Sequence, residues 1–349
     1  MRPVRPDGPL QTLPQMGSRA VRCWVVTDGK AGMESQCVGL AEALGLSPEI
    51  KRIAPRAPWR WLPPQLWPCP LQALGPQGDR LAPPWPDLLI ATGRQSVAPA
   101  IAVRRAAAGR TFTVQIQDPT VDPRQFDLVV APAHDGLKGE NVVATLGALH
   151  RVTPERLAGA ARQFRDRYAA LPRPLVAVLI GGDNRQYRLT DEAAARLADG
   201  LVRLARESGA GIAVTPSRRT GPHALAIIAE RLRGLAPGSW DIWDGSGDNP
   251  YFGMLALADA VVVTGDSVNM VSEACAAARP VYVFDLDGGS AKFDRFHAGL
   301  RDRGMTRRFD GRLESWQARP PDDMARVVAE IRRRMGQSAA ARRDAGLGN

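Results

Sequence analysis

Residues 258–287 constrain the fold most, because they combine a strand, a turn, a helix and a second strand in one short stretch. Residues 261–263 form a continuous β-branched run, which is the pattern of a strand buried on both faces of a parallel sheet. Asp266 or Ser267 can cap the helix that follows, and Pro280 precedes the next strand. The stretch therefore predicts part of a doubly wound α/β domain, with a helix beginning at the carboxyl end of a strand.

The start of that helix is a candidate anion site, because its unpaired backbone amides can bind a phosphate or diphosphate. Glu273 lies two turns into the helix. A carboxylate at this distance can accept hydrogen bonds from ribose hydroxyls, whereas the simpler alternative is a solvated glutamate on the helix surface. The spacing alone leaves both interpretations of Glu273 open.

The length of 349 residues exceeds that of one domain, which is typically about 100–200 residues. Strand, loop and helix alternate in both halves of the chain, and a proline-bounded segment separates them at 171–174. We expect two Rossmann-like α/β domains of the doubly wound class, facing one another across a cleft. The expected boundaries are a tail at 1–18, an acceptor-side domain at 19–170, a nucleotide-binding domain at 171–336 and a tail at 337–349.

The net charge of +10 fits an arginine-rich composition as readily as a basic surface for an anionic membrane, a phosphorylated ligand or nucleic acid. The four cysteines have no CxxC spacing, so neither a zinc site nor a disulfide framework is expected. No apolar run approaches the roughly 18 residues of a membrane span. These features predict a cytoplasmic protein, or one peripheral on the inner face of the cytoplasmic membrane.

A proline-rich segment at 55–70 concentrates Trp59, Trp61 and Trp67 together with arginines. The prolines exclude a long helix here. Tryptophan and arginine on a loop suit a membrane interface or a lipid-bearing acceptor. The alternative is a loop that folds its tryptophans back onto its own domain.

The loop at 28–36 follows the first predicted strand and leads into a helix, which places Asp28, Lys30, Glu34 and Ser35 at the rim of a sheet. Ligands bind at this rim in open α/β folds. The loop lacks the GxGxxG pattern, so the sequence does not support a dinucleotide fingerprint.

Two strand ends in the second half also carry candidate binding residues. The strand at 175–180 ends in Gly181 and Gly182, which permit close approach of a ligand to the backbone. A later strand, at 211–215, is followed by Pro216, Ser217, Arg218 and Arg219. Either arginine could bind a phosphate through a bidentate fork.

The chain closely resembles the mitochondrial-fission "elongated mitochondria" family, which is named from plant members and includes many bacterial proteins. The resemblance covers residues 24–309 and rests on the segments DGKAGMESQCVGLAEAL, PDLLIATGRQS, VQIQDP, DLVVAPAHD, VLIGGDN, NPYFGMLALADAVVVTGDSVNMVSEA and FDLDG. Ser35 stands where the family's usual DGxxGxENQ loop has an asparagine.

The C-terminal half is more distantly similar to the GT-B glycosyltransferases, in particular to the enzyme that adds N-acetylglucosamine to the lipid-linked peptidoglycan precursor. In that enzyme a SGxxTVSE-like turn and helix binds the nucleotide diphosphate, and the glutamate holds the ribose. The resemblance implies nucleotide contacts at Gly181, Gly182, Asn184, Ser267, Val268, Asn269, Met270 and Glu273, and donor-sugar contacts at Asp287, Gly288 and Lys292. It also places Glu34 and Ser35 near the loop that supplies the base.

We therefore expect a GT-B-like glycosyltransferase that uses a UDP-sugar, requires no cofactor or metal, and acts on a membrane-associated acceptor. Asp28 or Glu34 would deprotonate the acceptor hydroxyl, while Arg218 and backbone amides would stabilise the leaving diphosphate. One alternative is a nucleotide-sugar epimerase on the same fold. Another is a non-catalytic membrane-surface scaffold, as the family name implies. Nucleic acid is not an expected partner, because the arginines form no stripe with aromatic residues.

Overall fold

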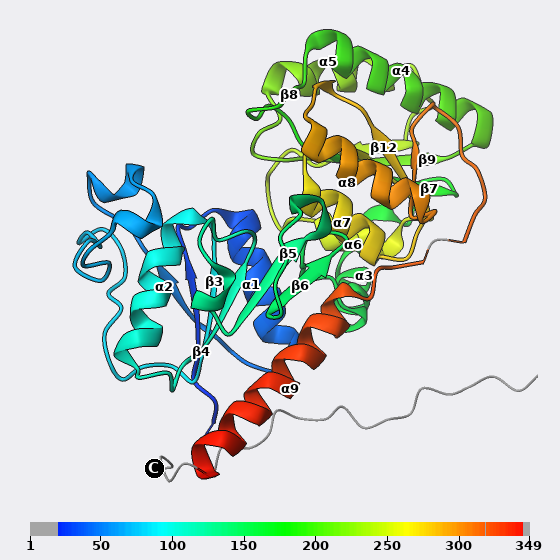
Figure 1. Cartoon of the computed structure of the whole chain (residues 1–349). Helices are drawn as coiled ribbons and strands as arrows, with labels where there is room; N and C mark the ends of the chain where they lie inside the picture. The colour runs from blue at the N-terminus through cyan, green and yellow to red at the C-terminus, as the bar shows by residue number, and fades with distance from the viewer. Residues whose placement is uncertain (1–19, 318, 345–349) are drawn as a thin grey trace, which may run out of the picture. The chain divides into compact units, whose positions relative to one another are not determined.

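The computed structural model describes residues 20–317 and 319–344, which divide into two compact units (Figure 1). Unit 1 consists of residues 20–131, 137–144 and 324–344. Unit 2 consists of residues 132–136, 145–317 and 319–323. The predicted tail at 1–18 lies outside the described residues.

Unit 1 is built on a six-stranded sheet in the order β2-β1-β3-β4-β5-β6. Its strands are β1 (Cys23–Thr27), β2 (Glu49–Arg52), β3 (Leu88–Thr92), β4 (Phe112–Ile116), β5 (Leu128–Pro132) and β6 (Val142–Thr145). Its helical segments are α1 (Ala31–Ala43), α2 (Arg94–Ala106) and α9 (Asp323–Asp344), with short 3-10 turns η1 (Trp59–Trp61), η2 (Pro64–Leu66) and η3 (Pro123–Gln125). Strands β1, β3 and β4 are buried throughout and pair in parallel. Apolar residues dominate β1 and β3, as is typical of parallel strands covered on both faces, whereas β4 also buries the polar Thr113 and Gln115.

Unit 2 is built on a second six-stranded sheet, all parallel, in the order β10-β9-β7-β11-β12-β14. Its strands are β7 (Leu175–Ile180), β9 (Gly211–Pro216), β10 (Trp240–Ile242), β11 (Ala260–Thr264), β12 (Val281–Phe284) and β14 (Thr306–Arg308), with a separate antiparallel pair β8 (Tyr187–Arg188) and β13 (Asp287–Gly288). Its helical segments are η4 (Ala133–Asp135), α3 (Pro154–Tyr168), α4 (Asp191–Ser208), α5 (Pro222–Leu232), α6 (Tyr251–Leu257), α7 (Val268–Ala276) and α8 (Ala291–Asp302).

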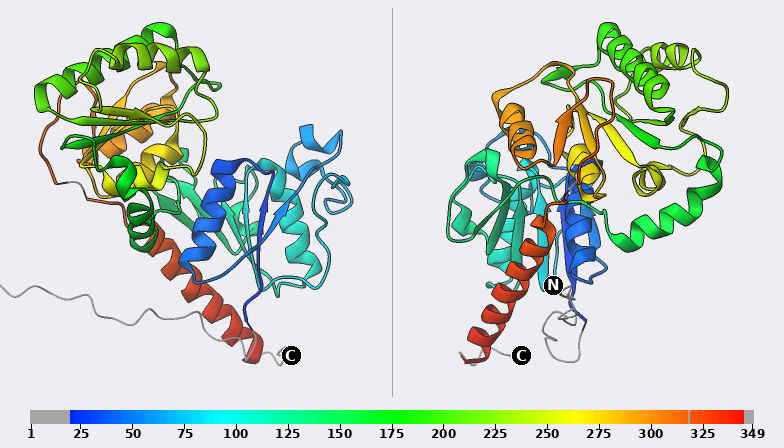
Figure 2. Two further views of the ribbon diagram at one scale, coloured as in Figure 1. Left: turned by 180° about the vertical axis from the view of Figure 1, so that it is seen from behind. Right: turned by 90° about the vertical axis from the view of Figure 1, so that its right-hand side faces the viewer.

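Helices cover both faces of the unit 2 sheet, and Figure 2 shows these layers from two further directions. Side chains of α4 and α5 pack with Val176, Val178 and Val262 on one face. Side chains of α3, α6, α7 and α8 pack with Ala177 and Val261 on the other face. The alternation of neighbouring residues along each strand produces two separate cores. The predicted class, two doubly wound α/β units, is confirmed.

The boundary between the units differs from the predicted one at 170/171. Helix α3 belongs to unit 2, because its Phe164 and Tyr168 are buried in the core that also contains Met254 and Leu255 of α6. The sequence signal at 171–174 marks the start of β7 rather than the change of unit. Proline punctuation identifies the ends of local elements, but only packing assigns an element to a core.

Helix α9 returns to unit 1, although it was predicted to close the nucleotide-binding domain. Val327 and Ile331 are buried one turn apart, and Arg334 donates to the carbonyl of Glu140 at 2.6 Å. The helix also extends to Asp344 instead of giving way to a tail at 337, because the added residues are mostly good helix formers. None of the helices in the described ranges is both long and apolar enough to cross a membrane.

Candidate functional site

Each sheet has a point at which the chain reverses its direction of growth, and in unit 2 this point lies between β7 and β11. From β7 the chain proceeds through β9 to β10 at one edge, then returns to β11 and proceeds to β12 and β14 at the other edge. Ligands of open α/β sheets bind outside the carboxyl ends of the strands at this reversal. The loops after Ile180 and Thr264 therefore form the primary candidate site.

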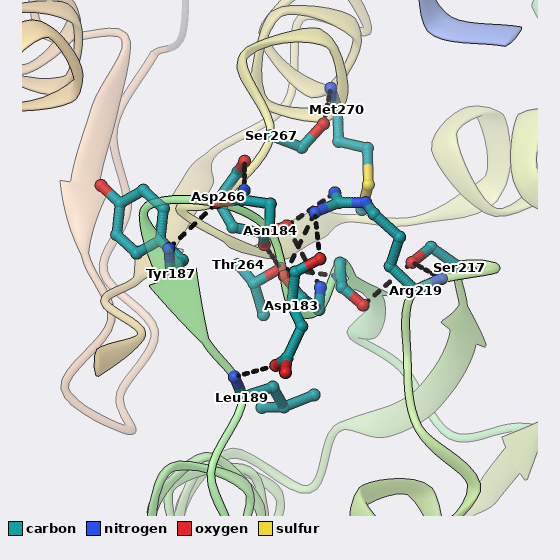
Figure 3. A network of polar contacts seen from close by, with 12 residues as sticks. Asp183, Asn184, Tyr187, Leu189, Ser217, Arg219, Thr264, Asp266, Ser267 and Met270 are labelled. Carbon is teal, nitrogen blue, oxygen red and sulfur yellow. Dashed lines mark hydrogen bonds and ion pairs between the residues drawn. The ribbon is translucent and has the colours of Figure 1, made fainter. Parts of the chain in front are cut away.

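The centre of these loops is the carboxylate of Asp266, whose side chain is fully buried (Figure 3). The hydroxyl of Thr264 donates to Oδ1 at 2.6 Å, and the amide of Gly182 donates to Oδ2 at 3.1 Å. Arg219 Nη2 lies 2.6 Å from the same Oδ2. A buried carboxylate is costly unless it is paired and hydrogen-bonded, and these contacts satisfy both conditions.

Gly181 and Gly182 are required by this packing. A Cβ at Gly181 would lie 2.1 Å from Asp266 Oδ1, and a Cβ at Gly182 would lie 2.1 Å from the carbonyl oxygen of Arg219. Gly182 also has φ +154. A ligand was predicted to approach the backbone at these two glycines. The space beside them is instead filled by Asp266 and by the backbone of Arg219.

The remaining polar groups of these loops hold the turn in shape. Asn184 Nδ2 donates to the carbonyl of Asp266 at 3.0 Å, while its Oδ1 accepts from the amide of Tyr187 at 2.9 Å. Ser217 Oγ donates to the carbonyl of Gly181 at 2.9 Å. The structure therefore gathers the predicted residues Gly181, Gly182, Asn184 and Ser217 around one buried carboxylate.

The predicted nucleotide segment after β11 forms the first turn of α7. Ser267 is the N-cap, and its side chain accepts from the amide of Met270 at 3.3 Å. Val268 and Asn269 occupy the first two helical positions, where amides lack intrahelical acceptors. This turn follows Asp266 directly, so the helix N-terminus lies at the sheet reversal.

Glu273 lies one turn further along α7, where it is partly buried and contacts another side chain of the protein. Its Oε2 accepts a hydrogen bond from the Tyr251 hydroxyl at 2.6 Å. Burial raises the pKa of Glu273, although the Tyr251 hydrogen bond opposes this rise. The Tyr251 hydrogen bond holds the Glu273 carboxylate in place on α7, and carboxylate oxygens can accept further hydrogen bonds from hydroxyl groups.

The two adjacent arginines after β9 have different roles. Arg219 is committed to Asp266 and also donates to the carbonyl of Gly182 at 3.1 Å. Arg218 is exposed and has no hydrogen-bond or ion-pair partner among the residues that the structure describes. Arg218 is therefore the cation available for a phosphate, while Arg219 is structural.

The predicted donor-sugar residues are each engaged by a different part of unit 2. Asp287 accepts from the Thr190 hydroxyl and forms an ion pair with Arg196 at 2.8 Å, and these contacts lower the pKa of Asp287. Gly288 follows in β13 with φ +106. Lys292 Nζ lies 2.6 Å from Asp135 Oδ1. No common group joins these three residues within the described chain, so their assignment to a sugar stays a prediction.

The predicted catalytic carboxylates lie in unit 1, beside its own reversal point between β1 and β3. Asp28 Oδ2 pairs with Lys30 Nζ at 2.5 Å. Arg52 donates to both oxygens of Glu34, each at 2.8 Å. Both oxygens of Glu34 are thus engaged by one guanidinium, so Glu34 would have to leave this ion pair to act as the predicted base. Ser35 follows Glu34 as the fifth residue of α1.

The three tryptophans of the 55–70 segment separate into inward and outward positions. Trp67 is buried and Trp59 is partly buried, and both pack with Ala98 of α2. Trp61 is 64% exposed. The predicted alternative, a loop folded back onto its own domain, holds for Trp67 and in part for Trp59. Trp67 is therefore not available to a membrane or an acceptor, and a membrane role for Trp61 stays a prediction.

The sequence pattern indicated Asp266 only as a possible helix cap and did not predict its central position in the site. A signal was present, because an acidic residue directly after the buried run of β11 must either reach solvent or find a cation. Its partner, Arg219, comes from the end of β9, 47 positions earlier in the chain, and nothing in the local pattern links the two.

Comparison with protein families gives a match to a model described as "Mitochondrial fission ELM1" over residues 31–335. A relative from Arabidopsis thaliana, "Mitochondrial fission protein ELM1", is 36% identical over 276 residues, which are 72% of this chain and 64% of the relative. The chain thus spans less than two thirds of the plant protein. "Uncharacterized protein RP120" from Rickettsia prowazekii is 26% identical over 286 residues, 70% of this chain and 78% of the relative.

Among solved structures, a candidate UDP-N-acetylglucosamine 2-epimerase from Listeria monocytogenes aligns with a TM-score of 0.51 and 12% identity. The alignment covers 91% of this chain and 98% of the other. At this identity the similarity concerns the fold, and it agrees with the two α/β units described above.

Proposed function

This chain belongs to the mitochondrial fission ELM1 family, and we propose that unit 2 binds a nucleoside diphosphate sugar for transfer to an acceptor hydroxyl. The family model confirms the resemblance predicted from the sequence. The observation that carries the proposal is the position of the α7 N-terminus, directly at the reversal between β7 and β11. The strand order of the sheet reverses at this point, and α7 begins there. The same helix carries Glu273, which we propose as the acceptor for the ribose hydroxyls.

The proposed binding mode combines the N-terminus of α7, the exposed Arg218 and the carboxylate of Glu273. The diphosphate would bind the first amides of α7 and the guanidinium of Arg218, and Glu273 would accept from the ribose. Asp266 does not repel this anion, because Arg219 neutralises it inside the loop. Fixed donors that need no reorganisation can stabilise the charge that develops on a leaving diphosphate.

The proposed function also requires an acceptor and a base. We propose that the acceptor is membrane-associated and that Asp28 is a better candidate base than Glu34, because the ion pair of Asp28 with Lys30 involves one carboxylate oxygen, whereas Arg52 engages both oxygens of Glu34. The sugar is expected to be attached to UDP.

The test is isothermal titration of the full chain with UDP, with GDP and CMP as comparisons. Micromolar binding of UDP is expected, and Arg218→Gln should weaken it at least about tenfold, because a cation–phosphate contact is lost. Glu273→Gln retains an acceptor for Tyr251 but removes the charge, and it should also weaken binding. Arg162→Gln is the matched control, since Arg162 is an exposed, unpartnered arginine on α3 within the described chain. No binding of any nucleotide would overturn the proposal.

A non-catalytic scaffold is the second candidate, and the paired state of Glu34 and Asp28 favours it. A scaffold needs no free base. Nucleotide binding without turnover of any UDP-sugar, unchanged by Asp28→Asn, would support this alternative.

A further inference from the structure

We propose that the tryptophan loop of unit 1, residues 55–70, docks this protein on an anionic lipid bilayer through Trp61 and Leu66, with Arg56, Arg60 and Arg94 binding the lipid phosphates. This inference goes beyond nucleotide binding and depends on unit 1 alone.

Trp61 and Leu66 are the large apolar side chains that unit 1 and unit 2 leave exposed within the described residues, at 64% and 59%. They lie five positions apart on one loop. Scattered single apolar residues are ordinary on a surface, but here both occur together. One loop therefore carries both of the large apolar side chains that are exposed in the described chain.

The loop is built so that these two side chains stay outside. Trp67, Trp59 and Ala98 form a small core beneath it. Gln65 Nε2 donates to the carbonyl of Thr120 at 2.7 Å, and Arg94 donates to the carbonyl of Arg60 at 3.0 Å. These contacts anchor the loop on the body of unit 1, so little conformational entropy is left to lose when it meets a surface.

The charge on the loop is uncompensated. No aspartate or glutamate occurs between Glu49 and Asp79. Arg56 donates to the carbonyl of Gln72 and Arg94 to that of Arg60, and neither contact involves a carboxylate. Cations beside an exposed tryptophan and leucine match the anionic headgroups and the apolar boundary of a bilayer.

A lipid surface fits these contacts better than nucleic acid does. The guanidinium of Arg60 lies 4.6 Å from the ring centroid of Trp61 and covers one face on which a base would stack. Leu66 offers a base no stacking surface, whereas an exposed aliphatic side chain gains free energy at the headgroup–acyl boundary.

The test is co-sedimentation of the full chain with phosphatidylcholine vesicles, with and without phosphatidylglycerol. We expect binding only to the anionic vesicles and a decrease with added salt. Arg56→Gln with Arg60→Gln should lower the partition about fivefold for each arginine. Arg162→Gln with Arg165→Gln removes the same charge from an exposed face of α3 and should leave binding nearly unchanged.

The apolar contact is tested separately. Trp61→Ala with Leu66→Ala should lower binding at least about tenfold, while unfolding by heat stays as in the parent chain. Brominated acyl chains should quench tryptophan fluorescence in the parent and less in Trp61→Phe, which reports insertion of this side chain.

Several results would overturn the proposal. They are equal binding to neutral vesicles, no vesicle binding, vesicle binding that the loop variants leave unchanged, and binding of single-stranded RNA in place of vesicles with loss in the same variants. UDP titration of the loop variants distinguishes a failure of lipid docking from a failure of the proposed nucleotide binding. Unit 2 should bind nucleotide whether or not the loop binds lipid.

Discussion

At the scale of single residues, Asp266 decides how the candidate site is organised. Its carboxylate joins the loops after β7, β9 and β11 through Gly182, Arg219 and Thr264. An unpaired charge at this position would destabilise the fold and repel an anion. Pairing with Arg219 removes both problems, so a negative residue can stand at a site proposed for a diphosphate.

Asp266→Asn is expected to lower the free energy of unfolding by about 2–3 kcal/mol, because it leaves Arg219 without its charge partner and removes a buried acceptor. Urea unfolding monitored by circular dichroism measures the change. Asp199→Asn is the matched control, since Asp199 pairs with Arg231 at the surface and should cost at most about 1 kcal/mol. Equal effects of the two substitutions would contradict the assigned role of Asp266.

At the scale of secondary-structure elements, the contact between α3 and α6 explains why α3 belongs to unit 2. Gly253 of α6 faces the ring of Phe164, and a Cβ at Gly253 would lie 2.6 Å from Phe164 Cδ2. Gly159, on α3 itself, has no heavy atom within 4 Å of such a Cβ. Replacement of glycine by alanine would therefore meet an aromatic ring at position 253 and open space at position 159.

Gly253→Ala is expected to destabilise unit 2 by about 1–3 kcal/mol through overpacking. Gly159→Ala should instead stabilise it by up to about 1 kcal/mol, because alanine favours a helix interior. Denaturant midpoints of the two variants test the pair. A neutral or stabilising Gly253→Ala would show that α3 and α6 are less closely packed than described.

At the scale of the whole molecule, α9 follows unit 2 in the sequence but belongs to unit 1. Ile331 is fully buried, and Arg326 donates to the carbonyl of Ala144 at 2.7 Å within unit 1. Ile331→Ala should cost about 2–4 kcal/mol through lost burial and a cavity. Hydrogen exchange should accelerate in β5 and β6, whereas β7 and β11 keep their protection. Acceleration confined to unit 2 would refute this assignment of α9.

Acid sensitivity is a second property of the whole molecule. Burial lowers the pKa values of His134, His150 and His297, all in unit 2. As the pH falls, these histidines take up protons in the unfolded chain at a higher pH than in the folded one. Their contribution to the free energy of unfolding is therefore fully present above about pH 6.5 and is lost as the pH decreases below that value. Each histidine can contribute at most about 1.4 kcal/mol per pH unit.

His297→Gln should reduce this pH dependence, because Gln retains a donor for the Gly265 carbonyl but does not titrate. Urea unfolding at about pH 7.5 and about pH 5.5 measures the difference between the two free energies. His223→Gln, at an exposed position, is the control. An undiminished pH dependence in His297→Gln would exclude His297 as one of its sources.

The sequence by itself determined the fold class and the positions of the strand ends, because β-branched runs and glycine or proline punctuation are local signals. It therefore located the turn before α7 and the loop after β7. Only the tertiary structure decided that Arg219 is structural while Arg218 is free, that Trp61 is exposed while Trp67 is buried, and that α9 returns to unit 1. These outcomes depend on partners distant in sequence, which local periodicity does not encode.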